Sequence, residues 1–151
     1  YTTGETALAW PALVDFGARY HRYCSDITRT FADTKKQEEV YQIVQEGQQL
    51  ALDMMEPGVA AREVHESVDA FFTGQGYPEM PHSLGHSLGL EVHDGASLGK
   101  ESSITLQEGM VVTVEPGIYL KNRWGIRIED DVLLTHDGTK VLTRKNPGRI
   151  V

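Results

Sequence analysis

The sequence predicts an α+β fold in which paired strands come first, two helices follow, and further strands close the chain. Two apolar runs near the start are separated by a turn, apolar residues then recur at helical spacing, and short runs rich in Val and Ile follow position 110. Because strands and helices are segregated along the chain, an antiparallel sheet is expected. The 151 residues contain no internal repeat or linker, so residues 1–151 are predicted to form one domain.

The first strand is predicted at residues 13–17, and it runs into a tight turn. Residues 23–31 are expected to be its antiparallel partner. Thr34 followed by Gln37 is a capping-box pattern, so a helix should begin there and end at the Pro57 and Gly58 pair. The apolar residues that share one face of this helix are Val40, Val44, Ala51 and Met55.

A second helix is indicated by four apolar residues at helical spacing, and it should end near Gly74 and Gly76. Those residues are Val64, Val68, Phe71 and Phe72. Residues 78–99 are rich in Gly, His and Ser, which favours irregular structure and makes this segment the expected place for a functional site. Strands are predicted at residues 110–115, 125–134 and 140–144, with Asp137 and Gly138 forming a hairpin turn between the last two.

Charge and cysteine content exclude several classes of function. The net charge of −8 and the pI near 5.2 argue against a nucleic-acid partner, which would require clustered Lys and Arg. Cys24 is the single cysteine, so a Cys-based zinc site and an internal disulfide are excluded, and this side chain should pack as a small hydrophobe. The sequence shows neither a run of transmembrane length nor a signal-peptide pattern, so a cytoplasmic location without a membrane partner is expected.

Carboxylates occupy strand positions that normally carry apolar residues, notably Asp15, Glu115 and Glu129. Taken singly, each would suit an exposed strand face or a structural ion pair. Strand alternation, however, places Thr113 with Glu115 on one face. The same alternation groups Arg127, Glu129 and Asp131, with Ile126 and Ile128 opposite. A hairpin also brings Asp15 near Asp26. Carboxylates that converge in this way repel one another unless protons or cations separate them, and two divalent ions are a common solution.

Three histidines fall between residues 82 and 93, and one of them can complete such a site. His82 and His86 are four residues apart, but their serine and glycine neighbours do not match the helical zincin motif. Four carboxylates with one imidazole suit Mn²⁺, Co²⁺ or Zn²⁺. The remaining histidines, including His93, are then available to bind substrate.

Six ordered motifs resemble the pita-bread metallopeptidases of family M24, in the branch of Xaa-Pro aminopeptidases and prolidases. The motifs are VDFG at 14–17, SDITRT at 25–30, HSLGHSLG at 82–89, VHD at 92–94, VEPGIY at 114–119 and GIRIED at 125–130. The resemblance implies the creatinase/aminopeptidase-like fold, a curved antiparallel sheet with helices on its outer face. Only 14 residues precede Asp15, so we expect the C-terminal larger part of the catalytic domain, incomplete at its N-terminus.

The resemblance also implies a site residue by residue. It makes the metal ligands Asp15, Asp26, His86, Glu115 and Glu129, with Asp26 and Glu129 bridging two divalent ions, most suitably Mn²⁺ with Co²⁺ or Zn²⁺ as alternatives. It gives Glu115 the role of proton acceptor for the attacking water. His82 and His93 would hold the scissile carbonyl or the tetrahedral intermediate, Arg127 would orient a ligand carboxylate from behind, and Tyr119 would border the pocket.

The implied activity is hydrolysis of the bond between an N-terminal residue and proline in a peptide substrate, as an aminopeptidase or a dipeptidase. A homodimer is also implied. Two alternatives stay open at this stage: a catalytically inactive metal- or peptide-binding module of this fold, and an enzyme similar to methionine aminopeptidase. His82 and Arg127 favour the proline-directed branch over the latter.

Other residues are expected to be structural. His65 is predicted to be a surface residue of the second helix, and His21 and His136 are predicted to lie in turns. Arg29 should order the strand that carries Asp26 through hydrogen bonds. Trp124 has no assigned role and is a possible neighbour of the pocket.

Overall fold

Residues 9–143 are described by the structure, a computed structural model, and they form two helices and nine short strands. The helices are α1 (Lys35–Met54) and α2 (Ala61–Gly74). The strands are β1 (Ala12–Phe16), β2 (Arg19–Tyr20), β3 (Tyr23–Cys24), β4 (Ile27–Phe31), β5 (Val111–Val114), β6 (Gly117–Leu120), β7 (Trp124–Arg127), β8 (Asp130–Thr135) and β9 (Gly138–Val141). The predicted α+β class is confirmed.

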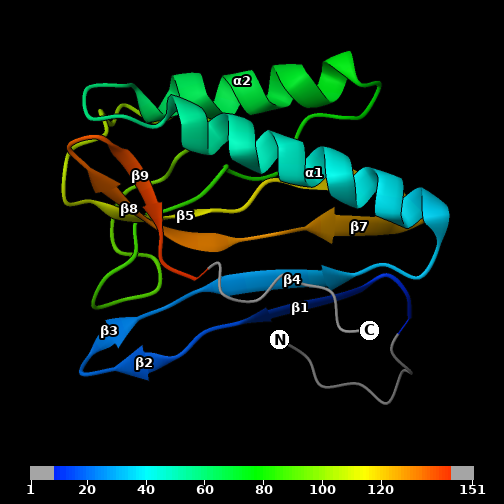
Figure 1. The fold of residues 1–151 in the computed structure, drawn as a ribbon, viewed down its shortest axis with the longest axis horizontal. Coiled ribbons are helices and arrows are strands. Elements are labelled where there is room, and N and C mark those ends of the chain that lie inside the picture. The colour runs from blue at the N-terminus through cyan, green and yellow to red at the C-terminus, as the bar shows by residue number, and fades with distance from the viewer. Residues whose placement is uncertain (1–8, 144–151) are drawn as a thin grey trace.

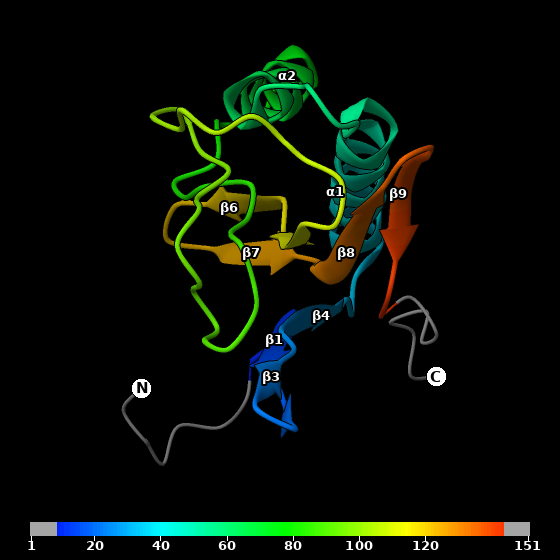
Figure 2. The ribbon, with the colours of Figure 1, turned by 90° about the vertical axis from the view of Figure 1, so that its left-hand side faces the viewer.

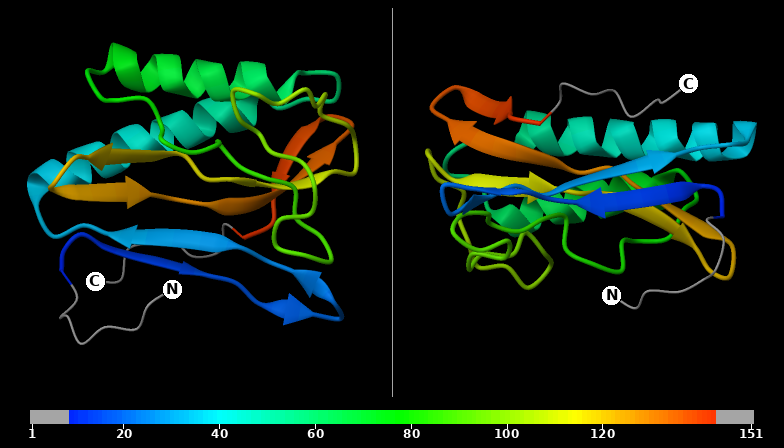
Figure 3. Two further views of the ribbon diagram at one scale, coloured as in Figure 1. Left: turned by 180° about the vertical axis from the view of Figure 1, so that it is seen from behind. Right: turned by 90° about the horizontal axis from the view of Figure 1, so that it is seen from below.

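The helices and strands form layers. Helices α1 and α2 lie together on one side of strands β5 to β9, and the pair β1 and β4 lies on the other side (Figures 1 and 2). Helix α1 contacts β5, β6, β7 and β9 directly, whereas α2 packs against α1. The strands pair in antiparallel ladders, with order β5-β8-β9 in one sheet and β1-β4, β2-β3 and β6-β7 in the others. The view from behind shows the long loop after α2 running beside the strand ends (Figure 3).

The predicted strand pair near the start is present, with a break in its second member. In the β1 and β4 ladder Asp15 lies opposite Thr28, while Asp26 falls in the break between β3 and β4. The β2 and β3 hairpin turns at His21 and Arg22, both with positive φ. His21 is therefore a turn residue, as predicted.

Helix α1 begins at the predicted capping box and ends earlier than expected. The Thr34 hydroxyl accepts from the backbone N–H of Gln37 (3.3 Å), and the Gln37 side chain accepts from the N–H of Thr34 (3.1 Å). The helix ends at Met54 instead of at Pro57 and Gly58. A proline disfavours the helical conformation of the residue before it, so the helix must stop before that position.

The buried face of α2 is wider than its apolar residues indicate. Val64, Val68 and Phe72 are fully buried, but His65 and Asp69 are buried between them, with His65 only 2% exposed. The prediction that His65 lies at the surface is wrong. This face meets the loop that follows the helix, so it buries polar groups that bind loop backbone as well as apolar groups that reach the core.

The closing strands differ from the prediction at two points. The run at 125–134 is divided at Glu129 into β7 and β8, because the chain leaves its pairing with β6 and begins pairing with β5. Strand β6 was not predicted. The hairpin turn at Asp137 is confirmed, with Thr135 opposite Gly138, and His136 lies in it. The predicted strand at 140–144 begins at Gly138, and residue 144 lies outside the described residues.

The core lies between α1, α2 and the strands β5 to β8. Its largest fully buried side chains include Phe72, Met55, Leu84, Ile118 and Ile126. Cys24 is buried as a small hydrophobe, as expected. Among residues 9–143, neither helix has the length and apolar character that a membrane span requires.

We expect the Gly47→Ala variant to be less stable than the wild type, although alanine is the better helix former by about 1 kcal/mol. A Cβ at position 47 of α1 would come within 2.6 Å of the Phe72 ring of α2. Overpacking a core contact of this kind costs about 1 to 3 kcal/mol, so a net loss is expected in chemical denaturation. In a Phe72→Leu background the same substitution should cost less; an equal or greater cost there would contradict the proposed clash.

Candidate metal and catalytic site

An open cavity of about 960 Å³ lies between the β1 to β4 segment, the loop at 82–93 and the ends of β5 and β7. Its charged and polar lining includes Asp15, Asp26, His82, His86, His93, Glu115, Arg127 and Glu129. Every site residue expected from the sequence, except Tyr119, is therefore part of this lining. These residues come from segments more than 100 positions apart in the chain.

Three of these residues form a group with the spacing of a cation site. One ligand atom from each of Asp26, His86 and Glu129 lies within 4.8 Å of the other two. Glu115 borders the group, because its Oε1 is 3.6 Å from His86 Nε2, which is also 3.7 Å from an Asp26 oxygen. The arrangement offers carboxylate oxygens and one imidazole nitrogen to a shared point.

The tautomer of His86 leaves its inward nitrogen available. Nδ1 lies 3.2 Å from the carbonyl oxygen of Ser87, to which a protonated Nδ1 donates. Nε2 then carries a lone pair directed toward the carboxylates. The backbone of His86 is itself fixed by Thr113, whose hydroxyl accepts from the His86 N–H at 3.0 Å. Such a partner on the second ring nitrogen is typical of histidines that bind metals.

Asp15 is paired with Arg127 in this structure. Arg127 Nη2 donates to Asp15 Oδ2 at 2.5 Å, and its Nε lies 3.8 Å from an oxygen of Glu115. The same Nε donates to the Thr28 hydroxyl, which in turn donates to Glu129 Oε2 at 2.6 Å. One guanidinium therefore orients carboxylates on both sides of the cavity.

Strand breaks position the two most central carboxylates. Asp26 lies between β3 and β4, where its backbone N–H donates to Asp131 Oδ1 (3.2 Å). Glu129 lies between β7 and β8 and bridges to Thr28 of β4. Period-two alternation placed Asp131 on the same strand face as Arg127 and Glu129. The hydrogen bond from Asp26 to Asp131 is a tertiary contact, so the sequence pattern does not predict it.

Burial raises the pKa values of four carboxylates in and beside this group. Loss of solvent raises the pKa of Glu129 to about 8 and that of Glu115 to about 7, and neighbouring carboxylates add to both shifts. Burial also raises the pKa of Asp131 to about 6 and raises the pKa of Asp26. The residues around these buried carboxylates carry too little positive charge to balance them when they are ionised. Divalent cations would supply that charge, and they suit this set of donor atoms.

A second network orders the cavity wall beside this group. His82 Nδ1 is 2.8 Å from the Ser83 carbonyl, and His82 Nε2 is 2.8 Å from the Tyr119 hydroxyl. The Tyr119 hydroxyl accepts from Arg127 Nη1 at 3.3 Å. Tyr119 thus lies behind His82 and Arg127. Burial is the main cause that lowers the pKa of His82, so its ring is neutral near pH 7.

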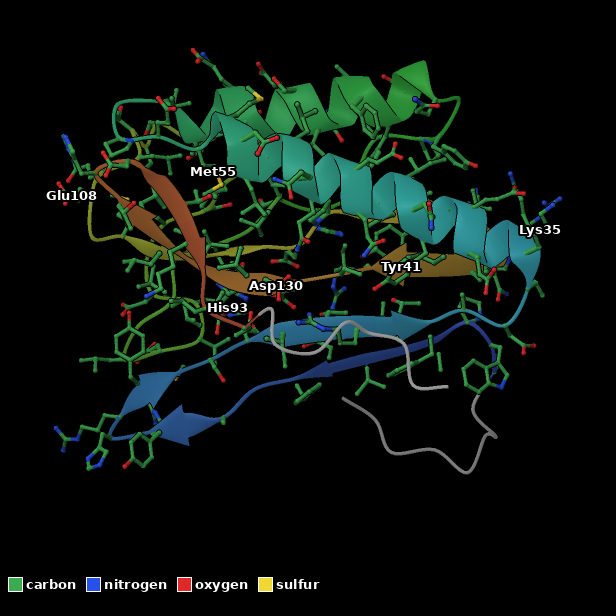
Figure 4. The ribbon with its side chains drawn as sticks, in the orientation of Figure 1. Lys35, Tyr41, Met55, His93, Glu108 and Asp130 are labelled. Atoms are coloured by element: carbon green, nitrogen blue, oxygen red, sulfur yellow. The ribbon has the colours of Figure 1, made fainter. Side chains whose placement is uncertain are left out.

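His93 approaches from the loop. Its ring centroid is 4.1 Å from that of His86, and the side chain is exposed, on the loop near β3 (Figure 4). The loop reaches β5 closely at Gly85, where a Cβ would collide with the backbone oxygen of Thr113. Glycine at this position therefore lets the loop bring its histidines onto the strand ends.

The remaining predictions concern residues outside the cavity. Arg29 donates to the carbonyl oxygens of Thr28 and Glu129 and pairs with Asp130 at 2.7 Å, which is the ordering contact expected of it. Asp130 lies between α1 and β4 (Figure 4) and also accepts from Gln48. Trp124 is not part of the cavity lining; it packs, half-buried, against the core.

A comparison with protein families identifies the chain. The model of metallopeptidase family M24 matches residues 9–136. The chain belongs to this family. Among M24 relatives, it is 43% identical over 136 residues to the Xaa-Pro dipeptidase of Pyrococcus horikoshii, a match that covers 87% of this chain and 39% of the relative. The chain therefore spans well under half of that relative's length.

Solved structures establish the fold within M24. The X-Pro aminopeptidase from Thermotoga maritima MSB8 superposes with a TM-score of 0.86 at 42% identity, covering 91% of this chain and 40% of that one. The prolidase from Pyrococcus furiosus gives 0.85 at 42% identity, with 89% and 41% covered. The pita-bread fold predicted from the motifs is confirmed, and this chain covers part of it.

Without metal, the folded protein should lose stability as the pH rises from about 6.5 to 8.5, above the range in which the buried histidines titrate. Glu129 and Glu115 hold protons more tightly when folded than when unfolded, so the stability they confer is complete below their unfolded pKa and is lost through about 7 to 8. The loss should be on the order of a few kcal/mol. Thermal unfolding of the protein in chelator would measure it.

The Glu129→Gln variant provides the control, because it removes the titrating group with little change in shape. Its stability should vary less with pH over the same interval. A wild-type profile that is flat, or that rises toward pH 8, would contradict the raised pKa values. Added Mn²⁺ should raise the melting temperature more at pH 8 than at pH 5, since cations compete with protons for these oxygens.

We expect Gly85→Ala to weaken divalent-cation binding although residue 85 supplies no ligand atom. The added Cβ must displace the loop from Thr113, and His86 is the next residue. Partners that position ligands contribute about 10- to 100-fold in metal affinity. Titration calorimetry with Mn²⁺ would measure the loss. Gly74→Ala, where a Cβ meets open space, should bind as the wild type does.

Proposed function

We propose that this protein is a metal-dependent exopeptidase that hydrolyses the peptide bond between an N-terminal residue and proline. The observation that carries the proposal is the convergence of Asp26, His86, Glu115 and Glu129, with Asp15 beside them, in one open cavity. The names of the relatives, Xaa-Pro dipeptidase and X-Pro aminopeptidase, supply the substrate class. The chain spans about 40% of those proteins, so the activity assigned to the whole is part of the proposal.

The cofactor in this proposal is a pair of divalent cations. The five residues that would hold them are Asp15, Asp26, His86, Glu115 and Glu129, which would supply carboxylate oxygens and one imidazole nitrogen. Their donor atoms suit Mn²⁺ best, with Co²⁺ or Zn²⁺ as alternatives. When bound, such cations lower the pKa of water toward neutrality and polarise a carbonyl.

Glu115 is the proposed proton carrier. Its Oε1 lies 3.6 Å from His86 Nε2 at the edge of the group formed by Asp26, His86 and Glu129, and a carboxylate positioned there can accept a proton from water and pass it on. The carboxylate is placed for this by the Thr113 hydroxyl, 3.4 Å from its Oε1, and by Arg127. In the proposal it takes the proton of the attacking water and delivers it to the leaving imino nitrogen of proline.

The histidines are proposed to hold the substrate. His82 is neutral and hydrogen-bonded at both ring nitrogens, so its orientation at the wall is fixed before a peptide arrives. His93 is exposed on the loop and stands over His86, where it can contact the scissile carbonyl or the tetrahedral intermediate. Tyr119 and Arg127 support His82 and the carboxylates. The substrate's free amine is proposed to lie near a carboxylate of the cluster, which limits cleavage to the first residue.

Metal-restored hydrolysis tests the proposal. The metal-stripped protein, supplied with Mn²⁺, should cleave Xaa-Pro and Xaa-Pro-Xaa peptides and should leave Xaa-Ala and N-acetylated peptides intact. Glu115→Gln should lower kcat about 10²- to 10⁴-fold, because it removes the proton carrier. Liquid chromatography of the products would show which peptide length is preferred.

The control is Glu101→Gln, an exposed carboxylate outside the cluster, which should retain full activity. Binding of Mn²⁺ without cleavage of any peptide would replace the peptidase proposal with that of a metal- or peptide-binding module. Preferential cleavage after N-terminal Met would favour the methionine aminopeptidase alternative.

A further inference from the structure

Helix α2 carries a buried polar pair that the proposed reaction does not use. His65 and Asp69 are 2% and 3% exposed and lie one helical turn apart, with His65 Nε2 3.3 Å from Asp69 Oδ2. A buried carboxylate and imidazole in a helix face cost free energy unless they satisfy other polar groups. Both of them bind the backbone of the segment that follows α2.

The contacts of this pair lie on both sides of His82. Asp69 Oδ1 accepts from the backbone N–H of Met80 at 2.8 Å. His65 Nδ1 accepts from the N–H of Leu84 at 3.2 Å, and this N–H is shared with the carbonyl of Leu98. The stretch from 80 to 84 is therefore tied to α2 at both ends, with His82 at its centre.

Leu84, which is bound to α2 through its N–H, also contacts Glu115. The carbonyl oxygen of Leu84 accepts from the backbone N–H of Glu115 at 2.8 Å. The peptide units of Leu84 thus connect α2 on one side with the end of β5 on the other. A shift of this residue would move His82 and Glu115 together.

The Leu84 N–H fixes the tautomer of His65, and Asp69 faces the other ring nitrogen. Nδ1 of His65 must be unprotonated to accept from Leu84, so the proton lies on Nε2, which faces Asp69. Lys100 lies 3.4 Å from the same oxygen and pairs with Glu79 at 2.5 Å at the surface. Asp69 Oδ2 thus lies between the Nε2 of His65 and one cation, Lys100.

We propose that His65 and Asp69 are positioning residues that fix His82 and Glu115 for the reaction through the backbone of Met80 and Leu84. The inference rests on the proposed peptidase function for its kinetic consequence but not for its structural one. The His65→Leu variant keeps the volume and removes the acceptor. His65→Asn keeps an acceptor near the position of Nδ1. Asp69→Asn keeps the contact to Met80 but presents an amide to Nε2, which favours the wrong tautomer.

Kinetics with Xaa-Pro peptides and Mn²⁺ test the catalytic consequence. His65→Leu and Asp69→Asn should lower kcat about 10- to 100-fold with KM changed less than about threefold, and His65→Asn should recover most of the loss. In a His82→Ala background, His65→Leu should cost clearly less than in the wild type, because its effect acts largely through His82. The same cost in both backgrounds would overturn the proposal. Glu66→Gln, an exposed neighbour on α2, should match the wild type.

Histidine ring ¹⁵N spectra of the metal-free protein provide a readout that needs no activity. In the wild type His82 should be protonated at Nδ1 and His65 at Nε2, with the signals assigned by His82→Ala and His65→Leu. The His82 resonances should shift in His65→Leu and return in His65→Asn, and Asp69→Asn should exchange the His65 tautomer. Unchanged His82 resonances in His65→Leu would refute the positioning role, whether or not the protein cleaves Xaa-Pro.

Discussion

The shared burial of like-charged carboxylates is the constraint on which the rest of the structure depends. Asp26, Glu115 and Glu129 face one cavity, and loss of solvent together with mutual repulsion raises their pKa values. A side chain placed in the middle of a ladder points where the pleat directs it, whereas the end of a strand gives the chain more freedom. Each of these carboxylates lies beside a strand end, and the sheet is accordingly divided into short ladders.

The segment at 82–89 fixes the tautomer and orientation of its two histidine rings. It repeats a short pattern, and both histidines place Nδ1 against the carbonyl of the following serine, Ser83 for His82 and Ser87 for His86. The His86 ring then directs Nε2 toward the carboxylates, and the His82 ring directs Nε2 toward the Tyr119 hydroxyl. Gly85 allows the loop to approach β5 closely enough for this arrangement to reach the carboxylates.

Local patterns predicted much of this fold, and tertiary contacts account for what they missed. The Thr34 capping box and the turn at Asp137 depend on residues a few positions apart, so the sequence identifies them. Strand alternation also grouped Glu129 with Arg127. The break at Glu129 and the pairing of β6 arise from competition between partner strands, which no local pattern records. His65 was misjudged because its chemistry suggested the surface, although its spacing with Val64 and Val68 follows the buried face.

The bridge between Thr28 and Glu129 joins residues about 100 positions apart, and it holds the two halves of the site together. The β1 to β4 segment leaves the ribosome before β7 and β8, the strands that complete its polar face. Asp15 and Asp26 must therefore remain hydrated and only loosely ordered until β7 and β8 have been synthesised. The order of the elements thus delays assembly of the group formed by Asp26, His86 and Glu129, so any cation that the complete group binds would be captured after the early steps of folding.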